Sequence, residues 1–171
     1  TTGATLVTTN DDGDADGGPN NVQNFPIIDS VRIMSSTEVA VYGKAPAGST
    51  IEFFITDGQS NMQGGRTLNY GEGKTFIGSA VEGTGQDLRS GTSAYNIDGN
   101  ISSNENLFSF ILPYSGLTSN DFLTATATLG DNTSEFGPAI QASQLTLNVT
   151  LESFSAVYSD QKVGLKWKAQ S

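Results

Sequence analysis

Strict alternation of apolar and polar residues is the feature that most constrains the fold of this chain. In residues 123–129, for example, every second residue is Leu or Ala and the residues between them are threonines. A two-residue period places successive side chains on opposite faces of a β-strand, and no segment shows the 3.6-residue period of an amphipathic helix. The pattern therefore predicts an all-β chain. The expected strands cover residues 27–34, 38–43, 51–55, 74–81, 107–112, 121–129, 145–152 and 163–168.

Turn residues separate these segments. Short strands bounded by Gly, Asn, Asp and Pro favour an antiparallel β-sandwich. Three polar stretches are longer than ordinary turns and span residues 8–24, 57–73 and 83–105. Loops of this length in a compact domain are either functional or disordered, and both options remain open for 83–105. A small additional hairpin within 83–105 is a third option.

Charge and composition exclude several classes of protein. The 171 residues include 18 acidic and 8 basic residues, for a net charge of −10. This balance argues against binding to nucleic acid or to an anionic membrane surface, and no stretch approaches the ~20 apolar residues of a membrane span. Cys and His are both absent, which removes disulfides, Ser-His-Asp triads and the usual zinc sites. The oxygen ligands that remain suit calcium or magnesium.

An acidic run in residues 10–21, with the sequence NDDGDADGGPNN, predicts a calcium site. Its carboxylates follow the D-x-D-x-D-G spacing, which turns alternate side chains toward one centre, and a divalent cation would relieve their mutual repulsion. The bidentate acid expected at the twelfth position is missing, because that position falls on Gln23. The predicted ligands are Asp12, Asp14, Asp16 and Asn20. The alternative interpretation is a disordered acidic linker.

A second predicted metal site lies in the turn after residues 121–129. Asp131 and Asn132 stand at the start of the run DNTSE. Their carboxylate and amide oxygens could bind a cation, but the same residue types also form ordinary turns by bonding to their own backbone. Both interpretations remain open.

Carbohydrate binding, strand addition and catalysis are three further functions to consider for this sequence. Tyr70 and Tyr95 stand in the long polar stretches and could stack on sugar rings, as in carbohydrate-binding modules, or pack on their own loops. Residues 143–158 form a long alternating stretch that could complete the sheet of a neighbouring subunit in a filament, or consist of two strands broken near Ser153. No pair of carboxylates is singled out by its spacing, so we expect no enzyme.

Four pieces of the chain occur in an order that resembles a known family. They are GDADGGPNNVQNFPII at 13–28, STIEFF at 49–54, YGEGKTFIG at 70–78 and LTATATLGDNTSEF at 123–136. In this order they resemble the immunoglobulin-like sandwich that follows parallel β-helix repeats in large bacterial secreted proteins. The resemblance implies an immunoglobulin- or fibronectin-like sandwich, a secreted or cell-surface location, and no catalytic residues. The chain departs from the family at 83–105, where a short turn is usual.

The tail resembles a different domain. Residues 151–156 and 163–167 are similar to the start of the fibronectin-like domain found before type IX secretion sorting domains. We therefore predict three parts: an acidic calcium-binding loop or linker at 1–26, a sandwich at 27–151, and 152–171 as extra strands or the start of a second sandwich. The chain begins on Thr1, so we expect a piece of a larger protein.

The predicted function is that of a calcium-stabilised structural or adhesive module. Its expected partners are neighbouring domains of the same protein, with glycans or other surface proteins as further candidates. Nucleic acid and membrane insertion are not expected.

Overall fold

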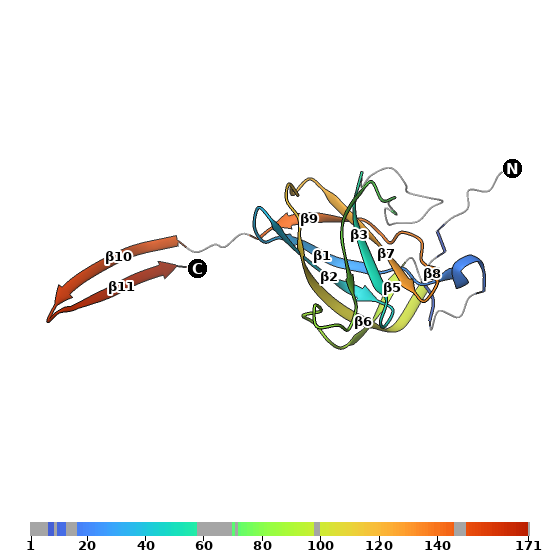
Figure 1. The fold of residues 1–171 in the computed structure, drawn as a ribbon, viewed down its shortest axis with the longest axis horizontal. Coiled ribbons are helices and arrows are strands. Elements are labelled where there is room, and N and C mark those ends of the chain that lie inside the picture. The colour runs from blue at the N-terminus through green and yellow to red at the C-terminus, as the bar shows by residue number, and fades with distance from the viewer. Residues whose placement is uncertain are drawn as a thin grey trace.

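The computed structural model of the chain describes residues 7–8, 10–12, 17–57, 70, 72–97, 100–145 and 150–170. This part of the chain is all-β, with no α-helix, as the alternation predicted (Figure 1). It contains one curled nine-stranded sheet, a separate two-stranded sheet, and a single 3-10 turn, η1 (Pro19–Val22), before the first strand.

The curled sheet has the strand order β4-β3-β7-β9-β1-β2-β6-β5, and β8 pairs with β7 outside this path. Its strands are β1 (Ile27–Ile33), β2 (Glu38–Ala45), β3 (Thr50–Thr56), β4 (Thr75–Val81), β5 (Thr92–Ile97), β6 (Asn100–Pro113), β7 (Phe122–Leu129), β8 (Asn132–Thr133) and β9 (Ile140–Gln144). The pairs β1·β2, β2·β6, β5·β6, β3·β4 and β3·β7 are all antiparallel.

One pair of strands contradicts the expectation of a purely antiparallel fold. The short strand β9 pairs antiparallel with β7 and parallel with β1, where Val31 lies opposite Ala142. The sheet is therefore mixed, and β9 joins its two halves. Alternation within a strand reports which face is buried but not the direction of the neighbouring strand, so this pair could not be read from the pattern.

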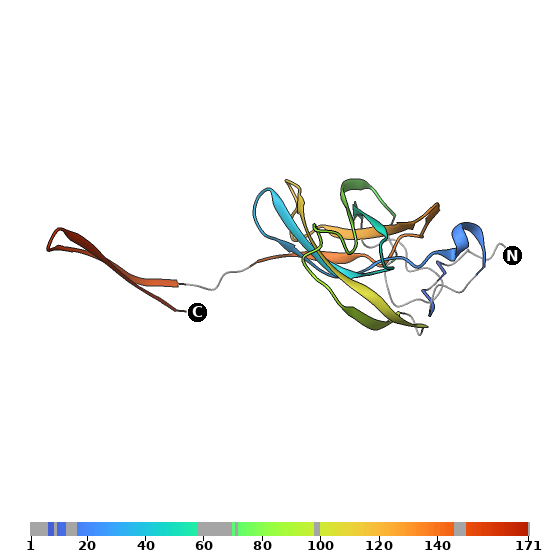
Figure 2. The ribbon, with the colours of Figure 1, turned by 60° about the horizontal axis from the view of Figure 1, so that its bottom comes forward.

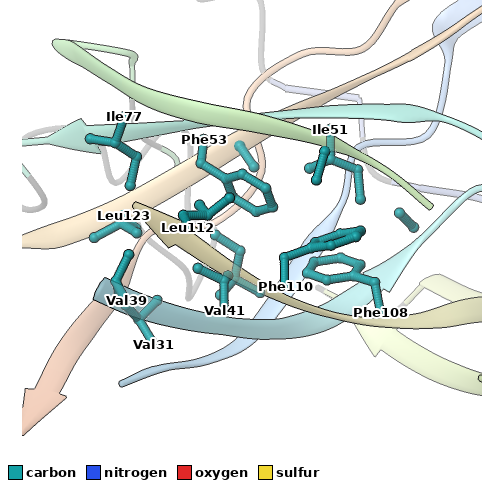
Figure 3. Close-up of a cluster of buried hydrophobic side chains, with 14 of the residues drawn as sticks. Val31, Val39, Val41, Ile51, Phe53, Ile77, Phe108, Phe110, Leu112 and Leu123 are labelled. Atoms are coloured by element: carbon teal, nitrogen blue, oxygen red, sulfur yellow. The ribbon is translucent and has the colours of Figure 1, made fainter. Parts of the chain in front are cut away.

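The core lies between the two halves of the curled sheet. Phe53 on β3 faces Phe108 and Phe110 on β6, with ring centroids 6.0 and 6.2 Å apart and the rings edge to face (Figure 3). Phe108 and Phe110 stack on each other at 5.3 Å. All three rings are at most 1% exposed. Such aromatic pairs add stability beyond their area, so they hold the two halves together.

Two stretches for which the sequence left alternatives open contain regular structure. In 83–105, β5 pairs with the first half of β6, which confirms the option of a small hairpin. The alternating stretch 143–158 includes parts of two strands, because β9 ends at Gln144 and β10 (Thr150–Ser159) begins at Thr150, while 146–149 lie outside the described residues. Ser153 lies within β10, so the break expected near this residue is not seen there. This arrangement supports the two-strand alternative over a single strand available for addition to a neighbour.

The tail forms a β-hairpin of its own. β10 pairs with β11 (Lys162–Gln170), and in the described part of the chain neither strand pairs with the curled sheet. A second domain beginning near residue 152 stays a prediction.

Gly43 on β2 lies where the core leaves no room for a side chain. A Cβ atom at this position would overlap the carbonyl oxygen of Ile27 and lie 2.5 Å from Cζ of Phe108. The absence of a side chain therefore lets β1 and the Phe108 ring approach β2 closely.

We expect Gly43→Ala to lower the free energy of unfolding by about 1–3 kcal/mol, because the added methyl group must displace backbone or a packed ring. Urea unfolding followed by far-UV circular dichroism measures the change. Gly85→Ala is the matched control, since a Cβ there meets nothing within 4 Å. Equal stabilities of the two variants would contradict this account of Gly43.

Candidate metal-binding site

The predicted calcium loop is held to the curled sheet at its base by Asn10. This side chain is 2% exposed. Its Nδ2 donates a hydrogen bond to the carbonyl oxygen of Phe25 at 2.7 Å, and its Oδ1 accepts one from the N–H of Phe25 at 2.8 Å. The amide side chain thus pairs with both backbone groups of one residue, as a neighbouring β-strand would.

Asn24 makes the reciprocal connection. Its Oδ1 accepts from the N–H of Asp11 at 3.0 Å, and its Nδ2 donates to the carbonyl oxygen of Asp11 at 3.0 Å. The Nδ2 also lies 3.4 Å from Oε1 of the buried Glu105 on β6. Together, Asn10 and Asn24 close a twelve-residue loop, 12–23, at both of its ends. Holding the ends together reduces the entropy that ligand binding would otherwise cost.

A second segment lies beside this loop. η1 contacts β8, and Figures 1 and 2 both place η1 at the end of the curled sheet where β8 lies. The N–H of Thr8 donates to the carboxylate of Glu135 at 2.7 Å. A cleft of about 340 Å³ lies between the two segments. It is lined by Thr8, Pro19, Asn20, Val22, Gln23, Thr133, Ser134 and Glu135.

The predicted ligands are placed as follows. Asp12 is exposed at the start of the loop, and Asn20 is exposed in η1 and lines the cleft. Asp14 and Asp16 lie outside the described residues. Among the residues that are described, no three acidic side chains come together in a way that could hold a metal ion. The calcium site therefore stays a prediction.

The predicted second site, at Asp131 and Asn132, stays a prediction. Asp131 is exposed and Asn132 is half-buried. Asn132 pairs with Leu129 in the register of β7 and β8. Neither Asp131 nor Asn132 lines the cleft. The acidic side chain of this turn that reaches the cleft is Glu135. The sequence placed Glu135 in the same turn, but it could not tell which side chain of the turn faces the N-terminal loop.

Gln23 lines the cleft, and one polar atom of its side chain is unsatisfied. It is 6% exposed, and its Nε2 has no hydrogen-bond partner among the described residues. A buried polar atom without a partner is costly. A half-turn of the amide exchanges Nε2 for Oε1, and an oxygen is the atom that a calcium ion requires. Gln23 occupies the twelfth position of the loop.

The two tyrosines predicted to bind sugars do not form an exposed pair. Tyr70 is 2% exposed and packs edge-on against Phe25, with centroids 5.6 Å apart. Its ring therefore lies in the interior, which favours the packing alternative over stacking on a sugar. Tyr95 lies in β5 opposite Ser102, and its side chain is outside the described part of the structure.

Comparison with known families, curated proteins and solved structures finds no match to this chain. The resemblance to the immunoglobulin-like sandwich of bacterial secreted proteins therefore stays a prediction. In the described part of the chain, no helix has the length and apolar character needed to span a membrane.

We expect Asn10→Ala to destabilise the protein by about 1–3 kcal/mol, because it leaves the buried N–H and C=O of Phe25 unpaired. Hydrogen exchange at the Phe25 amide should accelerate in the same variant. The control is Asn120→Ala, at an exposed position in a turn. A variant that exchanges and unfolds like the control would show that Asn10 does not hold the loop.

Proposed function

We propose that this chain is a non-catalytic, calcium-stabilised structural or adhesive module of a large secreted or cell-surface bacterial protein. The observation that carries the proposal is the acidic loop 12–23, whose two ends are held by the reciprocal hydrogen bonds of Asn10 and Asn24. A loop closed in this way is prepared to gather its carboxylates around one ion.

The chemistry of the surrounding groups favours a hard cation. Asp12, Asp14 and Asp16 supply the alternating carboxylates, and the chain offers oxygen ligands but no Cys or His. Glu135, from the neighbouring turn, would provide the acid that the loop itself lacks. Gln23 would contribute the oxygen of its amide. This donor set suits calcium, which accepts six to eight oxygen ligands in flexible geometry.

A cation in this position would act as a clamp. Glu135 already accepts a hydrogen bond from the backbone of Thr8, 127 residues away in the sequence. An ion shared between the loop and Glu135 would tie the residues before β1 to the segment after β7. Such a link removes freedom at the junction between this module and its neighbour, which suits a spacer or stalk.

The shape of the curled sheet supports an immunoglobulin- or fibronectin-like sandwich. Each half is antiparallel within itself, and side chains from β3 and β6 meet across a shared core. Residues 27–144 are close in length to the ~100 residues of such domains. The parallel pair β1·β9 is the feature that differs from a purely antiparallel sandwich.

We expect the midpoint of thermal unfolding to be about 5–10 °C higher with calcium than with excess chelator. This shift applies at a calcium concentration about one hundred times the dissociation constant of the site. Asp14→Ala should abolish the shift, and Glu135→Gln should reduce it while keeping the shape of the side chain. Differential scanning calorimetry measures all three proteins.

Glu38→Gln is the matched control, because Glu38 is an exposed acid at the start of β2 and does not line the cleft. It should respond to calcium as the unaltered protein does. A midpoint that is the same with calcium and with chelator would overturn the proposal, and the loop would then be a solvated linker.

A further inference from the structure

The hairpin β10–β11 has one wholly apolar face. Its register pairs Phe154 with Trp167, Ala156 with Leu165, and Tyr158 with Val163. Residues directly opposite in an antiparallel pair project from the same face, so these six side chains lie together. The other face carries a different set of pairs: Ser153 with Lys168, Ser155 with Lys166, Val157 with Gly164, and Ser159 with Lys162.

The apolar face is uncovered. Its aromatic residues Phe154, Tyr158 and Trp167 are 62%, 71% and 71% exposed. Val163 and Leu165 are 63% and 54% exposed. A hairpin of two strands is only marginally stable in water, and a contiguous apolar surface of this kind marks an interaction site. The face therefore needs a partner surface of similar size and character.

The described surface of the curled sheet has no such partner. Its exposed large apolar residues occur as two pairs, each in a separate cleft, or singly. The pairs are Leu88 with Ile111 and Met34 with Leu145, and the single residues are Phe76 and Leu129. Two side chains cannot cover a face of six. The one described surface that matches the hairpin in size and chemistry is another hairpin.

We propose that the apolar face of β10–β11 packs on the same face of a second copy of this chain. The contact is isologous, because identical surfaces meet about a two-fold axis. Sheets packed face to face lie about 10 Å apart, with their apolar side chains interdigitated. The lysines lie on the opposite face and remain in water.

Charge restricts the contact to the hairpins. Residues 150–170 contain three lysines and two acids, for a net charge of +1, whereas the whole chain carries −10, so the remainder carries −11. The acidic remainders of two copies repel each other. None of the six side chains of the apolar face is charged, so these side chains of two hairpins can meet without burying a charge.

The size of the contact indicates a weak, reversible dimer. An aromatic side chain buries about 150–250 Å². The faces of two hairpins would together cover roughly 1,000 Å², at the low end for specific protein interfaces. We therefore expect a dissociation constant of the dimer in the micromolar range.

The test is sedimentation equilibrium of the full chain over a wide range of concentrations. We expect the apparent mass to rise from 17.9 kDa toward twice that value as the concentration increases. Trp167 is the only tryptophan, so its fluorescence reports on this face alone. Its emission should shift to shorter wavelength over the same concentration range.

Two variants with opposite expectations make the test specific. Leu165→Asp places a charge on the apolar face and should leave the protein monomeric at all concentrations. Val157→Asp places the same charge on the opposite face, at a residue of similar exposure, and should dimerise as the unaltered protein does.

Three results would overturn the proposal. A monomer whose tryptophan emission is blue-shifted at every concentration would mean that the hairpin folds back on its own chain. A monomer with red-shifted emission throughout would mean that the face does not bind a second copy and is left for another partner, such as further strands of the second sandwich predicted from residue 152. Oligomers that survive Leu165→Asp would assign the association to another surface.

Discussion

The aromatic contact between Phe53 and the pair Phe108 and Phe110 is the interaction on which the rest of the structure depends. It joins the two halves of the curled sheet, and it requires the close approach that Gly43 permits. The same glycine admits the carbonyl oxygen of Ile27, where β1 begins. Phe25, two residues earlier, is held by Asn10, so the packing of the core determines where the acidic loop is attached.

The candidate site is therefore built on the fold rather than on the acidic run alone. The loop carries the carboxylates, but its position is fixed by two buried asparagines, and its neighbour Glu135 comes from the segment after β7. A repelling cluster of acids gains a function only where its backbone is held in place. The hairpin β10–β11 is different in kind, because its pairing is complete while its apolar face lacks a partner.

Local patterns predicted most of the strands, because a two-residue period reports burial of one face directly. They did not predict contacts between distant segments. The parallel pairing of β9 with β1, the burial of Tyr70 against Phe25 and the approach of Glu135 to Thr8 all depend on which strands become neighbours. The metal-site candidates Asp131 and Asn132 stay predictions, and the sequence of their turn does not show that Glu135 is the acidic side chain that lines the cleft.

The parallel pair of β1 and β9 has a mechanical consequence. The chain enters β1 at the end of the sheet near η1 and leaves β9 at the other end, where Gln144 lies opposite Ile33 (Figure 1). Tension between the two ends would pull these strands along their length in opposite directions. Their hydrogen bonds would then bear the load together, in shear, instead of opening one after another. A module with this connectivity can transmit force between the two ends of its sheet without unzipping.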